Sequence, residues 1–178
     1  MVDLNSQYLR IKEEVNAGIQ HVIDTTTFIK GGKVNDFQQE LEKYLDVKHV
    51  IPVGNGTDAL QIALMALDLK KGDEVILPDF TFIATAEVVA LLGLTPVLVD
   101  VDFETFNISI PALKNAITSK TKAIVPVHLF GQNADMESIL EIANAHELYV
   151  IEDACQSIGS EYTFNKKKKM HSGCMGDI

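Results

Sequence analysis

Residues 54–58, with the sequence Gly-Asn-Gly-Thr-Asp, have the residue types of an anion-binding loop. They lie between a short apolar run and a segment with helical periodicity, so we expect them to lead into a helix. The N–H groups of a first helical turn lack intrahelical partners and the helix dipole is positive there, so a phosphate can bind. The Thr57 hydroxyl can add a hydrogen bond. The alternative is an ordinary tight turn in which Thr57 or Asp58 caps the helix.

Asp153 directly follows the apolar segment 149–152. A carboxylate at the end of a buried strand requires a polar partner. The protonated nitrogen of a pyridine ring is one candidate, because the negative charge favours the protonated form. Such a ring is an electron sink for carbanion chemistry, as in pyridoxal phosphate. The alternative is an aspartate that caps a helix or forms a salt bridge.

Other residues near the same predicted strand ends are compatible with ring binding. Phe82, at an expected helix start, could stack on a flat cofactor or be an ordinary core aromatic. Gln156 could bond a ring hydroxyl or a nearby loop backbone. His128 either faces the same edge or is a hydrogen-bonded structural histidine. We interpret the lysine run 166–169 as a solvated loop tip, because a Schiff-base lysine should be single and desolvated.

The elements that must position these residues follow a regular order. Apolar spacing predicts an amphipathic helix over 6–24 and a second helix, capped by Asn35, up to residue 45. Strands are then expected at 50–53, 74–77, 96–99, 122–127 and 149–152. Helices are expected between them at 57–67, 82–92, 110–117 and 136–146. A further strand is expected at 157–164, followed by a hairpin tip at 165–169.

The predicted strands are continuous apolar runs, which is typical of parallel strands covered by helices on both faces. The expected fold is therefore α/β, a doubly wound and mostly parallel sheet with right-handed crossovers. In such sheets ligands bind at the carboxyl ends of the strands. Residues 54–58, Phe82, Asp153 and Gln156 should therefore converge on one edge.

Composition restricts the class of protein. The chain has 178 residues, 47% of them hydrophobic, and a net charge of −10. Such an acidic chain is not expected to bind nucleic acid. Two cysteines without metal-binding spacing predict reduced thiols. No apolar run approaches the roughly 20 residues that cross a bilayer, and no signal peptide is recognised, so we expect a cytoplasmic location without membrane partners.

Five motifs appear in an order that matches one known family. They are VGNGTDAL (53–60), GDEVI (72–76), FTFIAT (80–85), PVHLFG (126–131) and IEDACQ (151–156). With them, the chain resembles the DegT/DnrJ/EryC1/StrS family of sugar aminotransferases, which have the fold type I architecture of the aspartate aminotransferase superfamily. The resemblance divides the chain into an N-terminal helical segment, 1–48, and a large cofactor-binding domain, 49–178.

The resemblance implies a homodimer that binds pyridoxal phosphate. It implies transfer of an amino group, usually from glutamate, to a keto sugar on a nucleotide diphosphate, in surface polysaccharide or deoxyaminosugar synthesis. The cofactor-binding residues that it implies are Gly56, Thr57 and Asp58 for the phosphate, Phe82 for stacking, Asp153 for the ring nitrogen and Gln156 for the ring hydroxyl. For Asp58 we expect the backbone N–H to bind, with the side chain turned away.

The family's Schiff-base lysine and small C-terminal domain are expected beyond Ile178. The 178-residue chain by itself is therefore predicted to lack transaminase activity.

Three alternatives remain open from the sequence. Residues 54–59 also fit the dinucleotide fingerprint G-x-G-x-x-G/A, and Asp79 lies where a ribose-binding acid belongs, as in an NAD-dependent dehydrogenase. Some relatives are sugar dehydratases of the same fold, in which a histidine replaces the lysine. A binding or regulatory role without catalysis is the third.

Overall fold

The computed structural model describes residues 3–165 and 167–178 of the chain. The chain divides into two compact units, Met1–Pro52 and Val53–Ile178, each described by itself below. The predicted boundary, between residues 48 and 49, lies slightly earlier. Within the described ranges, none of the helices combines the length and apolar character that crossing a bilayer requires.

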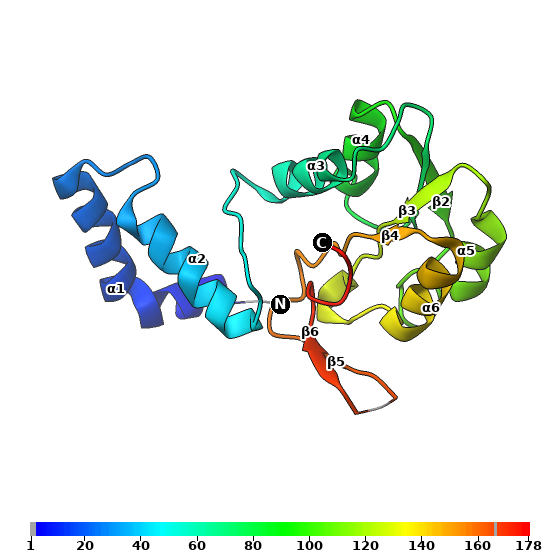
Figure 1. The fold of residues 1–178 in the computed structure, drawn as a ribbon. Coiled ribbons are helices and arrows are strands. Elements are labelled where there is room, and N and C mark those ends of the chain that lie inside the picture. The colour runs from blue at the N-terminus through cyan, green and yellow to red at the C-terminus, as the bar shows by residue number, and fades with distance from the viewer. Residues whose placement is uncertain (1–2, 166) are drawn as a thin grey trace. The chain divides into compact units, whose positions relative to one another are not determined.

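The first unit consists of two helices, α1 (Leu4–Thr25) and α2 (Gly32–Leu45) (Figure 1). The helix predicted over 6–24 is confirmed. It begins where the Asp3 carboxylate accepts a hydrogen bond from the Ser6 N–H at 3.0 Å, which satisfies one of the free donors of the first turn. It ends at Thr25 and is followed by the capping residue Thr26, whose φ of 52° is left-handed.

The second helix begins earlier than the sequence predicted. Asn35 was expected as the cap, but it lies inside α2, and Gly31 precedes the first turn. The Gly31 carbonyl accepts the Val34 N–H at 3.0 Å, which starts the helical pattern without a capping side chain. The prediction was wrong because a glycine pair can open a helix through its backbone alone.

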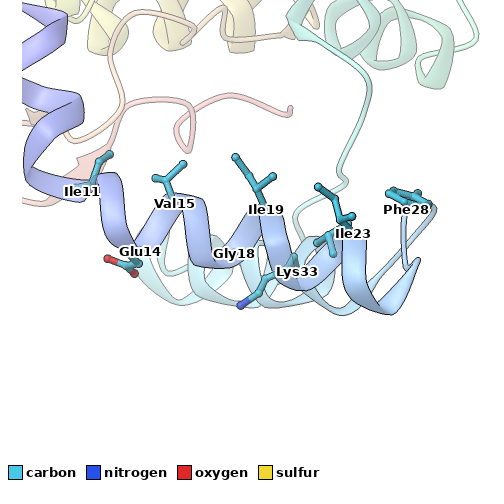
Figure 2. Close-up of a pocket in the computed structure, with 9 residues that line it drawn as sticks. Ile11, Glu14, Val15, Gly18, Ile19, Ile23, Phe28 and Lys33 are labelled. Atoms are coloured by element: carbon cyan, nitrogen blue, oxygen red, sulfur yellow. The ribbon is translucent and has the colours of Figure 1, made fainter.

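Neither α1 nor α2 contains a buried residue. Apolar residues recur at helical spacing on α1, and Figure 2 shows Ile11, Val15, Ile19 and Ile23 along one side of the helix. Together with Phe28 they line an apolar pocket of about 750 Å³ within this unit. The first unit therefore has the pattern of a core-facing helix pair but leaves that face exposed.

The second unit is built on a sheet of four parallel strands in the order β2-β1-β3-β4 (Figure 1). The strands are β1 (Glu74–Pro78), β2 (Thr95–Val99), β3 (Thr121–Ile124) and β4 (Tyr149–Val150). The helices are α3 (Gly56–Ala66), α4 (Ala84–Leu91), α5 (Ile110–Ala116) and α6 (Met136–His146). This confirms the predicted α/β class with a parallel sheet.

Side chains of β1 alternate between the two faces of the sheet. Val75 and Leu77 pack in a cluster with residues of α3 and α4, whereas Ile76 packs with residues of α5 and α6. All three are fully buried. Burying such a side chain stabilises the fold by about 1.5–3 kcal/mol. Helices on both faces thus explain why the strand is apolar at every position.

β2 forms one edge of this sheet. The Thr95 N–H donates to the Asp73 carbonyl at 2.8 Å, and the Asp79 N–H donates to the Val99 carbonyl at 2.9 Å. In a parallel ladder this places the odd-numbered residues of β2 toward β1. The nitrogen of Pro96 therefore faces the open edge, where a missing N–H leaves the ladder intact.

The strand predicted at 50–53 is not formed. The Val50 N–H donates instead to the Glu42 carboxylate at 3.0 Å, and Ile51 is 75% exposed. The prediction relied on apolar content, but a strand also needs a neighbouring strand for its backbone groups. β3 and β4 are likewise shorter than predicted, because regular pairing stops before residue 127 and before residue 152.

The end of the chain forms a hairpin, as expected, but its first strand is shorter than the strand predicted over 157–164. β5 (Glu161–Thr163) pairs antiparallel with β6 (Lys169–His171). The predicted tip at 165–169 includes Lys166, which lies outside the described residues. A short 3-10 helix, η1 (Leu129–Gly131), precedes α6.

Candidate functional site

A cavity of about 240 Å³ lies beside the carboxyl ends of the strands of the second unit. Its walls come from the first turn of α3, the segment entering α4, and the segments after β3 and β4. The lining residues are Gly56, Thr57, Leu60, Thr81, Phe82, Ala84, Val127, Asp153, Cys155 and Gln156. Five of the six predicted cofactor-binding residues line this cavity, and Asp58 does not.

The first turn of α3 is capped by Asn55. Its side-chain oxygen accepts the Asp58 N–H at 2.9 Å, and its amide donates to the Asp58 carboxylate at 3.0 Å. The Asp58 N–H, which the sequence assigned to phosphate binding, is thus used inside the protein. Among the described residues, nothing accepts a hydrogen bond from the N–H groups of Gly56 and Thr57. These two donors remain for a ligand.

Close packing explains the glycine at position 56. A side chain there would place its Cβ 3.1 Å from the Cys155 sulfur, which is tighter than ordinary contact. Burial and, next, the hydrogen bond and charge of Asp153 raise the pKa of the Cys155 thiol to about 11. A thiol with a raised pKa is ionised less at neutral pH, which makes Cys155 a poorer nucleophile.

Asp153 is fixed through its backbone. It forms a parallel bridge with Val127, its N–H donates to the Pro126 carbonyl at 2.9 Å, and its carbonyl accepts the His128 N–H at 3.0 Å. Only 7% of the residue is exposed. The strand ends thus place a carboxylate on the cavity wall with little freedom of its backbone.

The Asp153 side chain is held as well. Its Oδ2 accepts a hydrogen bond from the Thr85 hydroxyl at 2.9 Å, and its Oδ1 accepts a longer one from the Cys155 N–H at 3.4 Å. No salt-bridge partner is found for this carboxylate in the described part of the chain. The salt-bridge alternative is therefore not supported, and the Cys155 N–H gives only a long capping contact. A cationic ligand group fits this buried carboxylate.

Phe82 and Gln156 lie on the same cavity. Phe82 is 71% exposed, so it is not the core aromatic that the sequence left as an alternative. The Gln156 side-chain oxygen accepts the Phe130 N–H at 2.7 Å, which is the loop-backbone contact left open by the sequence. Phe130 has a left-handed φ of 56°. Within the described residues the Gln156 amide nitrogen makes no hydrogen bond, so it can donate to a ligand.

His128 does not face the cavity. It is fully buried, its Nδ1 accepts the Ala134 N–H at 3.1 Å, and its Nε2 is 2.7 Å from the Glu152 carboxylate. Since Nδ1 accepts, Nε2 carries the proton and donates to Glu152. Of the two interpretations left open by the sequence, the structural histidine is confirmed.

Glu152 joins the end of the chain to the sheet. Its carboxylate also accepts the N–H groups of Gly173 at 2.9 Å, Met175 at 2.5 Å and Gly176 at 2.6 Å. Burial acts to raise the pKa of Glu152, but the bonds from His128 and the amides outweigh it and leave the pKa below its ordinary value. This cluster could not be predicted from residue spacing, because its donors lie far from Glu152 along the chain and three of them are backbone N–H groups.

Residues 9–178 match the sequence pattern of the DegT/DnrJ/EryC1/StrS aminotransferase family. The chain belongs to this family. It is 49% identical over 161 residues to the UDP-2-acetamido-2-deoxy-3-oxo-D-glucuronate aminotransferase of Pseudomonas aeruginosa, a match that covers 90% of this chain. The match covers 45% of that relative, so the chain spans a little under half of its length.

Two solved structures agree with this chain in fold. An aminotransferase of this family from Brucella abortus is 43% identical and superposes with a TM-score of 0.92 over 98% of this chain and 48% of its own. The GDP-4-keto-6-deoxy-D-mannose-3-dehydratase of E. coli with bound hydrated PLP is 34% identical, with a TM-score of 0.81 over 90% of this chain and 42% of its own. The second of these carries out a different reaction on the same architecture.

Proposed function

We propose that this chain forms the cofactor-holding part of a pyridoxal phosphate-dependent aminotransferase. One observation carries the proposal: two free N–H groups, of Gly56 and Thr57, and the buried Asp153 carboxylate line the same cavity. The two N–H groups can bind an anionic group, and the buried carboxylate can bind a cationic one. Their shared cavity therefore suits a ligand that is anionic at one end and cationic at the other. The PLP-bound dehydratase of similar fold supports the same choice.

The residues present fit this cofactor. Gly56 and Thr57 would hold the phosphate, Asp153 would hold the ring nitrogen, Phe82 would cover a face of the ring, and the Gln156 amide would donate to the ring hydroxyl. Asp58 would contribute through the cap that it forms with Asn55 rather than through a free N–H. When bound, pyridoxal phosphate supplies an electron-poor ring that stabilises negative charge at the reacting carbon.

The chain's own side chains set the conditions for that chemistry. Asp153 keeps a proton on the ring nitrogen, because a buried carboxylate favours the charged partner. Phe82 excludes water from one face of the ring. The Cys155 thiol, with its raised pKa, stays neutral beside Asp153 and adds no competing charge.

We further propose that the substrates are a nucleotide-linked keto sugar and an amino donor, glutamate, and that the protein is a homodimer. The aminotransferase of Pseudomonas aeruginosa, at 49% identity, favours amination over the dehydration carried out by the 34% identical E. coli enzyme. The 178-residue chain by itself is proposed to be inactive, because the lysine that holds the cofactor in this family is expected beyond Ile178.

Cofactor binding is tested by titrating the protein with pyridoxal phosphate and with pyridoxal, which lacks the phosphate. Loss of the phosphate and the substitution Asp153→Asn should each weaken binding by about tenfold or more, because each removes a charge-assisted contact. Glu161→Gln, on the exposed hairpin, is the matched control and should bind like the wild type. Equal affinities for both ligands and both aspartate forms would overturn the proposal.

The reaction class is tested with glutamate and a nucleotide-linked keto sugar as substrates. Formation of 2-oxoglutarate together with an amino sugar supports an aminotransferase. Loss of a sugar hydroxyl without gain of an amine would favour the dehydratase. A measurable transamination rate from the 178-residue chain alone would refute its proposed inactivity.

A further inference from the structure

Thr85 lies behind the cavity and touches its central carboxylate. The residue is 1% exposed, and its hydroxyl donates to Oδ2 of Asp153 at 2.9 Å. The two residues are 68 positions apart in the chain, and one belongs to α4 while the other follows β4. The contact is therefore built by the fold and not by local sequence.

The backbone bonds of Asp153 do not fix its side chain. The Pro126 and His128 bonds hold the main chain, but rotation about the side-chain bonds remains. The Thr85 bond removes that freedom by using one oxygen of the carboxylate. Oδ1, whose contact to Cys155 is long at 3.4 Å, is then the oxygen with spare acceptor capacity.

Thr85 is itself oriented by its own turn. The Thr81 and Thr85 hydroxyl oxygens are 3.4 Å apart, so Thr81 can donate while Thr85 donates onward to Asp153. The Thr85 N–H donates to the Phe82 carbonyl at 3.2 Å. The turn that carries Phe82 on the cavity wall thus also holds the backbone of Thr85.

We propose that Thr85 is a positioning residue for the cofactor: its hydroxyl holds the Asp153 carboxylate so that Oδ1 remains available to the ring nitrogen. The inference rests on the proposed function of the same cavity and adds a residue that does not line it. Thr85 acts through Asp153, so it affects how well the carboxylate binds and charges the ring rather than the chemistry itself.

The test compares Thr85→Val, which keeps the shape and removes the hydroxyl, with Thr85→Ser, which keeps the hydroxyl. Thr85→Val should weaken pyridoxal phosphate binding by about tenfold, the usual effect of one lost hydrogen bond to a charged group. Thr85→Ser should restore affinity to near the wild-type value. The pH midpoint of the bound cofactor's ring absorbance should also fall in Thr85→Val, because a misplaced carboxylate stabilises the ring proton less.

A double-mutant cycle with Asp153→Asn separates positioning from general destabilisation. Thr85→Val added to Asp153→Asn should cost little further affinity, because the contact is already lost. If Thr85→Val does not fold, Thr85→Ala and Thr85→Ser form a second pair that differs by the hydroxyl alone. Thr85→Ser should then bind more tightly than Thr85→Ala.

The failures of the two proposals are distinguishable. If the wild type does not bind pyridoxal phosphate, or Asp153→Asn binds it equally well, the proposed function of the cavity is wrong. If Asp153→Asn weakens binding but the variants without the hydroxyl bind and titrate like the wild type, the cavity stands and the role of Thr85 is overturned.

Discussion

The two units of the chain have similar apolar patterning but very different burial. Helices α1 and α2 of Met1–Pro52 contain no buried residue, and Ile19 in the middle of α1 is 55% exposed. In Val53–Ile178 the sheet is covered by two apolar clusters, and residues such as Leu113 are fully buried. An amphipathic pattern thus specifies a helix in both units, but it specifies packing only where a second surface is supplied.

The difference matters for the candidate site. Every residue that lines the cavity, from Gly56 to Gln156, belongs to the second unit. Its side chains are therefore held by a core that the same unit forms. The first unit contributes none of these residues, so changes to α1 should leave the cavity geometry unaffected.

The largest expected effect is at the buried Glu152. Glu152→Gln places an amide where the carboxylate accepts hydrogen bonds from His128 and three N–H groups. The amide offers one acceptor oxygen in place of two, so buried N–H donors lose their partner, and each such loss costs about 1–3 kcal/mol of unfolding free energy. Glu161→Gln removes an exposed pair with Lys169 and should cost at most about 1 kcal/mol. Urea unfolding measures both, and equal losses would show that the buried cluster adds no stability.

The same variant should change the response to acid. The folded-state pKa of Glu152 is lowered, so its contribution to stability is present above the unfolded pKa, about 4.3, and is lost as pH falls through the folded value. Unfolding free energy of the wild type should therefore fall in this acid range, and Glu152→Gln should fall less. If the unfolding free energies of the two proteins fell in parallel with pH, the lowered pKa of Glu152 would be contradicted.

The next effect contrasts packing in the two units directly. Leu113→Ala empties a fully buried site and should lower unfolding free energy by about 2–5 kcal/mol. Ile19→Ala, on the exposed face of α1, should change it by about 0.5 kcal/mol or less. Chemical denaturation followed by circular dichroism gives both values. If the two substitutions cost the same, the face of α1 is packed in solution and the contrast between the units fails.

The smallest effect concerns helix starts. Asn55→Ala removes the side-chain cap of α3 and should cost about 1 kcal/mol. Asn35→Ala is its matched control, since Asn35 lies exposed inside α2, where alanine is the better helix former. Thermal unfolding should therefore show a lower midpoint for Asn55→Ala and an unchanged or higher one for Asn35→Ala. The reverse order would contradict both assigned helix starts.

Much of the fold could be predicted from local pattern alone. The helices and the β1 and β2 strands lie within a few residues of the predicted ranges, because periodicity and Gly or Pro boundaries act locally. The strand predicted at 50–53 is not formed, because none of the strands in the described part of the chain pairs with it. The cap predicted for α2 was wrong. Asn35 is a residue type that often caps helices, but α2 begins earlier, after Gly31.

The meeting of Asp153, Gly56 and Thr57 at one cavity was predictable, because each lies at a strand or helix end. Their role in cofactor binding stays a prediction. The Asn55–Asp58 cap was harder, because both residues could serve either the cap or a ligand, and only coordinates show which N–H is used. Thr85 and Glu152 were missed. Both act through contacts between distant segments, and nothing in the spacing of residues along the chain reveals such contacts.

Pro96 has a consequence for self-association. An incoming strand from another molecule would have to dock along β2 and pair with the outward-facing amides, those of residues 96 and 98. Proline removes the first of these donors, so an added strand would meet an interrupted ladder with the Leu98 N–H alone in this stretch. The exposed edge of the sheet thus resists pairing with a strand of another molecule, because Pro96 has no N–H to donate.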